Sequence, residues 1–80
     1  MAIVKSIIAR RWFEKTNGNT YHTVELALDN DLTIKSPRAY GYGDQWTRTA
    51  RGLARQHNVV MLDKTIWDAV VLEVKRKKDL

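Results

Sequence analysis

The chain offers few side chains that could carry out a covalent reaction. It has 80 residues and no cysteine, so hydroxyl groups are the main candidate nucleophiles. Ser6 and Ser36 would each need a histidine and a carboxylate nearby, and neither lies in a strand–turn–helix elbow. His22 and His57 lack both His-x-x-x-His spacing and a cysteine partner, so a metal site is not indicated. We therefore expect packed or capping histidines, no metal, no cofactor and no enzyme activity.

Glycine alternates with tyrosine just before a predicted helix, and this segment is the most unusual in the chain. It reads Tyr40-Gly41-Tyr42-Gly43-Asp44-Gln45. Backbone N–H groups of such glycines can cradle a phosphate at a helix N-terminus. Here Asp44 would repel an anion, and Trp46 stands where a dinucleotide-binding fingerprint has its third glycine. The pattern favours a structural corner formed by the glycines, and it leaves Tyr40 and Tyr42 as candidate contacts with a partner.

The chain is basic, and its cations lie in three clusters. Fourteen Lys and Arg against nine Asp and Glu give a formal net charge of +5, which makes polyanions plausible partners. The clusters are Arg10-Arg11, then Arg48, Arg51 and Arg55 at helical spacing, and finally Lys75-Arg76-Lys77-Lys78. The helical stripe is either a solvated face or a binding surface. The last cluster is either part of a soluble tail, residues 75–80, or a set of phosphate contacts.

The first third of the chain predicts two antiparallel strands. Residues 3–14 and 20–28 are rich in β-branched and aromatic types and alternate between apolar and polar. Asn17-Gly18 between them is a strong signal for a two-residue hairpin turn. That turn fixes the register of the two strands and thereby decides which side chains share a face.

In this register one face is apolar and the other is aromatic and charged. Arg10 lies opposite Glu25, and Trp12 is a diagonal neighbour of Tyr21 on the same face. Arg11 falls on the apolar face, so it must reach an edge of the sheet or a partner.

The rest of the chain predicts a third strand and a helix. Residues 32–36 form a strand after a three-residue loop, residues 29–31, and Pro37 ends it. Asp44 caps the helix and Asn58 stops it. Trp46, Ala50, Leu53 and His57 share one face of this helix, and Arg48, Arg51 and Arg55 lie on the opposite face.

The C-terminal part can be interpreted in two ways. Residues 68–76 alternate, and their three valines favour a final strand. The alternative is a helix capped by Asp63, with Ile66, Val70 and Val74 in line on one face. The apolar run 59–62 fits neither period.

These elements predict a single α+β domain, residues 1–80. Its antiparallel sheet has β-β-β-α-β order, and one helix packs on one face. The other face carries Arg10, Trp12 and Tyr21 and stays open. Aromatic side chains flanked by arginines suit base stacking or a protein interface. Alternatively, residues 59–67 or the second subunit of a homodimer could cover them.

Four segments of the chain resemble a group of small bacteriophage and prophage proteins that brings no established activity. The segments are Arg10-Arg11-Trp12-Phe13, Asn17-Gly18-Asn19-Thr20-Tyr21-His22, Ala39-Tyr40-Gly41-Tyr42-Gly43-Asp44-Gln45 and Arg76-Lys77-Lys78-Asp79-Leu80. The resemblance implies a context, because small phage proteins of this kind often act by stoichiometric binding, as anti-CRISPR and other anti-defence proteins do.

Two functional hypotheses follow. The first is a non-enzymatic phage-type protein that binds and inhibits a host protein or nucleoprotein complex that handles nucleic acid. The second is direct binding to DNA or RNA. No apolar run approaches the ~20 residues of a membrane span, so we expect a cytoplasmic protein without a membrane partner. The candidate binding residues are Arg10, Arg11, Trp12, Tyr21, Tyr40, Tyr42, Arg48, Arg51, Arg55, Lys75, Arg76, Lys77 and Lys78.

Overall fold

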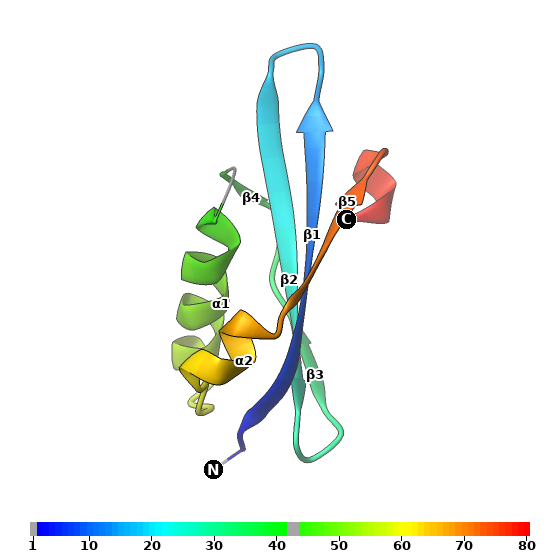
Figure 1. Cartoon of the computed structure of the whole chain (residues 1–80). Helices are drawn as coiled ribbons and strands as arrows, with labels where there is room; N and C mark the ends of the chain where they lie inside the picture. The colour runs from blue at the N-terminus through cyan, green and yellow to red at the C-terminus, as the bar shows by residue number, and fades with distance from the viewer. Residues whose placement is uncertain (1, 42–43) are drawn as a thin grey trace.

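A computed structural model describes residues 2–41 and 44–80 as a mixed five-stranded sheet with a helix on one face (Figure 1). The strands are β1 (Val4–Glu14), β2 (Asn19–Leu28), β3 (Thr33–Lys35), β4 (Ala39–Tyr40) and β5 (Val70–Val74). The helices are α1 (Gln45–Gln56), α2 (Asp63–Trp67) and the 3₁₀ turn η1 (Lys77–Asp79). Within the described ranges, no helix is long and apolar enough to cross a membrane.

The sheet is mixed, so the prediction of a purely antiparallel sheet is wrong at its last strand. Strands follow the order β3-β2-β1-β5, β4 also pairs with β2, and β5 runs parallel to β1. The reason lies in α1, which starts beside the hairpin end of β2 and returns the chain to the start of β1. There Val60 donates to the carbonyl oxygen of Ala2 at 2.9 Å and accepts from Val4 at 2.8 Å. A chain that re-enters at that end must continue alongside β1 in the same direction.

The hairpin is longer than predicted. β1 and β2 are joined by four residues, 15–18, and Gly18 takes a φ of +69° while its N–H donates to the carbonyl oxygen of Glu14 at 2.8 Å. This shifts the register by two residues from the predicted one. Because side chains alternate with a period of two, residues 6–14 keep their predicted faces. A bulge between Val4 and Ser6 breaks the alternation, and Val4 therefore lies in the core with Ile7. One partner changes decisively, since Trp12 now lies directly opposite Tyr21.

The hydrophobic core lies between α1 and one face of the sheet. Buried side chains from the two layers meet there, with Leu26 fully buried. They are Val4, Ile7, Ala9, Val24, Leu26, Leu28, Trp46, Ala50, Leu53 and Ala54. The predicted apolar faces of the helix and of residues 20–28 are therefore confirmed, except at His57, which caps the end of α1 and is exposed.

Both ends of α1 lie where the sequence predicts them. Asp44 is the N-cap residue, although its side chain makes no capping bond and Thr47 Oγ1 instead donates to its carbonyl oxygen at 2.7 Å. Asn58 follows the last turn with a φ of +56°, and Val59 N donates to the carbonyl oxygen of Ala54 at 3.0 Å. This left-handed ending satisfies helix carbonyls that lack an intrahelical donor.

The three-residue loop at 29–31 is confirmed. Leu28 N donates to the carbonyl oxygen of Leu32 at 2.8 Å, and Asp31 takes a φ of +69°. Leu26 then pairs with Ile34, as the apolar pattern requires.

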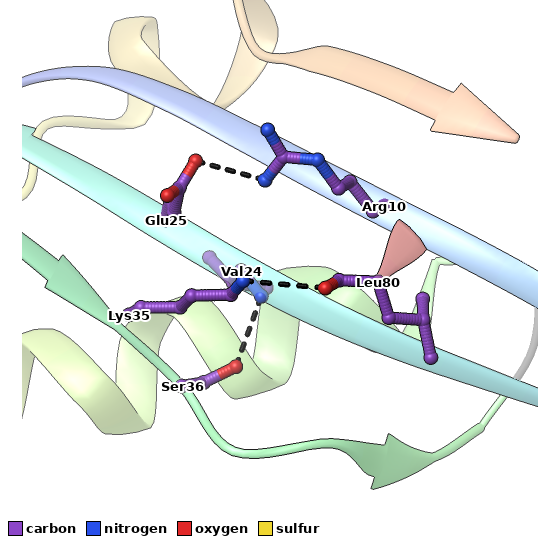
Figure 2. A network of polar contacts seen from close by, with 6 residues as sticks. All are labelled: Arg10, Val24, Glu25, Lys35, Ser36 and Leu80. Carbon is purple, nitrogen blue, oxygen red and sulfur yellow. Dashed lines mark hydrogen bonds and ion pairs between the residues drawn. The ribbon is translucent and has the colours of Figure 1, made fainter. Parts of the chain in front are cut away.

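Pro37 ends β3, but the edge of the sheet resumes after it. β4 pairs with β2 through Tyr21 and Tyr40. Between β3 and β4, the buried Ser36 bridges the break because its Oγ accepts from the backbone N–H of Val24 at 2.9 Å (Figure 2). The sequence pattern did not predict β4.

In the C-terminal part the predicted final strand is confirmed, and the alternative of a helix that continues through Val70 and Val74 is wrong, because the helix ends at Trp67. Asp63 begins a short helix, α2, and Val70–Val74 form the strand β5. The basic end is not a loose tail, because η1 lies on the side of the sheet away from α1 (Figure 1). Lys35 Nζ donates to the backbone oxygen of Leu80 there at 3.2 Å.

Candidate functional site

Three aromatic side chains form a row across the face of the sheet that α1 leaves open, and we call this row the aromatic ladder. Trp12 comes from β1, Tyr21 from β2 and Tyr40 from β4. Trp12 and Tyr21 stack with ring centroids 5.8 Å apart, and Tyr21 meets Tyr40 edge to face at 5.7 Å. Trp12 and Tyr21 are half-buried, whereas Tyr40 is 64% exposed. Tyr21 therefore holds the row together, and Tyr40 is its accessible end.

Arg38 belongs to this cluster, and the sequence analysis missed it. Its guanidinium carbon lies 5.4 Å from the centroid of the Tyr21 ring, within the range of a cation–π interaction. Arg38 and Tyr40 are two residues apart and point to the same side, as alternate residues of an extended segment do. The i, i+2 spacing of Arg38 and Tyr40 could have indicated that the two side chains lie on one face, but only if β4 had been predicted as a strand.

Arg10 and Arg11 are separated by the sheet. Arg10 NH1 pairs with Glu25 Oε2 at 2.8 Å on the open face (Figure 2). Arg11 NH2 pairs with Glu73 Oε1 of the edge strand β5 at 2.7 Å, which confirms that it reaches an edge. Arg11 thus lies on the face opposite to the aromatic ladder, as its predicted position on the apolar face requires, because successive strand residues point to opposite faces.

A shallow basic hollow of about 670 Å³ lies beside the aromatic ladder. It is lined by Thr23, Lys35, Ser36, Arg38, Lys77, Lys78 and Leu80. Four of these side chains are cations, and none of the described lining residues has a carboxylate side chain. Lys35 and Arg38 were not among the predicted site residues, because only the fold brings them next to the C-terminal lysines.

The remaining predicted cations lie elsewhere. Arg48, Arg51 and Arg55 are exposed residues of α1, and α1 lies on the other side of the sheet from the ladder (Figure 1). Arg51 pairs with Asp63 at 3.0 Å. Lys75 is exposed, and Arg76 Nε lies 3.7 Å from Asp79 Oδ2. The predicted basic residues thus form two surfaces, and Tyr42 lies outside the described residues.

His22 and Gly41 form the structural corner that the glycine pattern predicts. The His22 ring is buried, with Nδ1 at 3.2 Å from the carbonyl oxygen of Gly41 and Nε2 at 2.6 Å from Thr49 Oγ1. Gly41 has a φ of +149°, and an added Cβ would lie 2.7 Å from Gln45 Cβ. Gly43 lies outside the described residues. His57 is the C-cap of α1 and is exposed.

The described part of the chain contains no group of three or more His, Cys, Asp or Glu side chains that could hold a metal ion. Comparisons of the chain with protein families, with curated proteins and with solved structures find no match. The function is therefore argued from the aromatic ladder and the basic hollow.

Proposed function

We propose that the protein is a non-enzymatic nucleic-acid-binding protein that holds single-stranded DNA or RNA on the open face of its sheet. The observation that carries the proposal is the aromatic ladder directly beside four cations. Proteins that bind single strands combine stacking side chains with a positively charged path for the backbone.

The geometry of the ladder supports unpaired bases as ligands. The exposed ring of Tyr40 and the outer part of Trp12 offer surfaces for stacking, while Tyr21 is enclosed by Trp12, Tyr40 and Arg38. Bases in a duplex stack on one another and leave no face for a side chain. We therefore expect a preference for single strands over a duplex of the same sequence, with little dependence on the base.

Besides base stacking on the ladder, the cations of the hollow contribute to the affinity for a single strand. Lys35, Arg38, Lys77 and Lys78 gather within one hollow, so a strand lying on the ladder passes close to them. Neutralising phosphates releases counterions from the strand, so binding should weaken as salt rises. The logarithm of the binding constant should fall against the logarithm of the salt concentration with a slope of about −0.7 for each phosphate contacted.

Fluorescence anisotropy with a labelled oligothymidine tests this function, with Tyr40→Ala as the diagnostic variant. Loss of one stacked base should weaken binding by about 1–3 kcal/mol. Phe13→Ala is the matched control, because Phe13 is 55% exposed and lies on the opposite face of β1. Equal affinities of the parent and both variants, or equal affinity for duplex and single strand, would reject the proposal.

A second candidate is inhibitory binding to a host protein complex that handles nucleic acid, in the context that the resemblance to small phage proteins implies. Trp67 favours it, because this side chain is 84% exposed beside a groove of about 530 Å³ that Trp46, Ile66 and Val71 help to line. The same groove is lined by the charged residues Asp44, Arg51 and Asp63, and a large exposed aromatic beside a groove of mixed polarity is typical of a protein interface. A pull-down from nuclease-treated bacterial lysate with the parent and Trp67→Ala separates this candidate from direct strand binding.

A further inference from the structure

The buried hydroxyl of Thr23 has no visible partner, and Thr23 lines the basic hollow. Thr23 is 5% exposed, it lines the hollow, and its Oγ1 has no hydrogen-bond partner among the described atoms. Buried polar groups are rarely left without a partner, because the lost hydrogen bond to water is not replaced. An unpaired donor beside a cluster of cations points to a ligand rich in acceptor oxygens.

The charges around Thr23 define the sign of that ligand. The hollow combines Lys35, Arg38, Lys77 and Lys78. Two carboxylates close in sequence to lining residues are already paired. Glu25, two residues from Thr23, binds Arg10 at 2.8 Å, and Asp79, which follows Lys78, lies 3.7 Å from Arg76. The local field therefore favours an anion.

We infer that the basic hollow is a phosphate-binding site in which Thr23 Oγ1 donates a hydrogen bond to a phosphate oxygen. Lys and Arg side chains around it supply charge-assisted hydrogen bonds to the other oxygens. That the ligand is a phosphate of a nucleic-acid backbone rests on the proposed function. That the hollow binds a phosphate group is independent of the proposed function.

Arg38 connects this site with the aromatic ladder. It lines the hollow and at the same time lies over the ring of Tyr21. A nucleotide can therefore place its base against the ladder and its phosphate in the hollow without bridging a gap. Lys35 already donates to the backbone oxygen of Leu80 at 3.2 Å (Figure 2), so a bound phosphate competes for that lysine and should shift η1.

Amide NMR titration with inorganic phosphate, and separately with an oligothymidine, tests the inference. We expect phosphate to shift the amide signals of Thr23, Ser36 and Lys78. Thr23→Val keeps the shape of the side chain and removes the hydroxyl, so it should weaken phosphate binding about tenfold, the weight of one hydrogen bond to a charged group. The same variant should fold at least as stably as the parent, because it removes an unpaired buried hydroxyl.

A charge-matched pair of double variants controls for the loss of positive charge. Lys77→Gln with Lys78→Gln should abolish the phosphate shifts, whereas Arg48→Gln with Arg55→Gln on α1 should leave them in place. The two proposals can fail separately. An oligothymidine that binds while phosphate leaves these amides unchanged, with Thr23→Val equal to the parent, overturns the phosphate site alone. Phosphate shifts that depend on Thr23, without oligothymidine binding, support the site and overturn the proposed function.

Discussion

His22 shows how single residues hold the open face in place. Its ring is buried between β2 and α1, one nitrogen faces the carbonyl oxygen of Gly41, and the other faces Thr49 Oγ1. Tyr40 immediately precedes Gly41, so the position of the accessible aromatic ring depends on this corner. A histidine that the sequence offers as a candidate for chemistry thus has a positioning role in the fold.

Gly41→Ala should destabilise the protein, and Gly52→Ala should not. At Gly41 the backbone has a φ of +149° and a Cβ would lie 2.7 Å from Gln45 Cβ, so we expect a loss of more than about 1 kcal/mol. Gly52 lies within α1, where a Cβ would meet nothing within 4 Å, and alanine there should stabilise by about 0.5–1 kcal/mol. Urea denaturation of both variants measures the difference. Identical midpoints would show that the corner imposes no conformational demand.

At the scale of elements, the irregular edge of β2 depends on Ser36. Ser36 Oγ accepts from the backbone N–H of Val24 at 2.9 Å, at the break that Pro37 makes between β3 and β4. Without this acceptor, a buried N–H in the centre of the sheet would lose a partner. The edge segment that carries Lys35, Arg38 and Tyr40 is therefore tied to β2 by one side-chain hydrogen bond as well as by the backbone.

Ser36→Ala should cost about 1–3 kcal/mol, the penalty of leaving a buried donor unpaired. It should also speed the hydrogen exchange of the Val24 amide relative to its neighbours. Ser6→Ala is the control, because Ser6 is exposed on β1. If Val24 exchanges at the parent rate in Ser36→Ala, the bridge does not hold the edge together.

The sequence predicted the elements that local patterns define. Period-two alternation gave the faces of β1 and β2, and the helical period gave the buried face of α1. An error of two residues in the hairpin register left the faces of residues 6–14 and of β2 intact, because an even shift preserves them. The bulge between Val4 and Ser6, which brings Val4 into the core, was not predicted. The placement of Trp12 and Tyr21 together on the face that α1 leaves open was predicted on the same grounds.

Features that depend on distant contacts were not predictable in this way. The parallel direction of β5 follows from where α1 returns the chain. β4 is a two-residue strand that pairs with β2 after the break at Pro37, and no local pattern predicts where pairing resumes. Arg38 and Lys35 join Lys77 and Lys78 only after η1 has folded against the sheet. No spacing in the sequence shows that these four cations lie close together, so the basic hollow was not predicted.

On the scale of the whole molecule, the chain has a formal net charge of +5, and its clustered cations lie on two sides of the sheet. One side carries the exposed arginines of α1, and the other combines cations with the aromatic ladder. A purely electrostatic binder would use both sides about equally, because phosphate contacts alone do not distinguish them. The account here assigns nucleic acid to the side where charge and aromatic rings occur together.

Mapping a bound oligothymidine by amide NMR tests this central claim most directly. We expect the largest shifts at Trp12, Tyr21, Thr23 and Tyr40, with the amides of Arg48 and Arg55 nearly unchanged. The bound strand should leave the open face when salt is raised, since the affinity depends partly on released counterions. Shifts that centre on α1, or a protein whose spectrum does not respond to the oligonucleotide at low salt, would contradict the account.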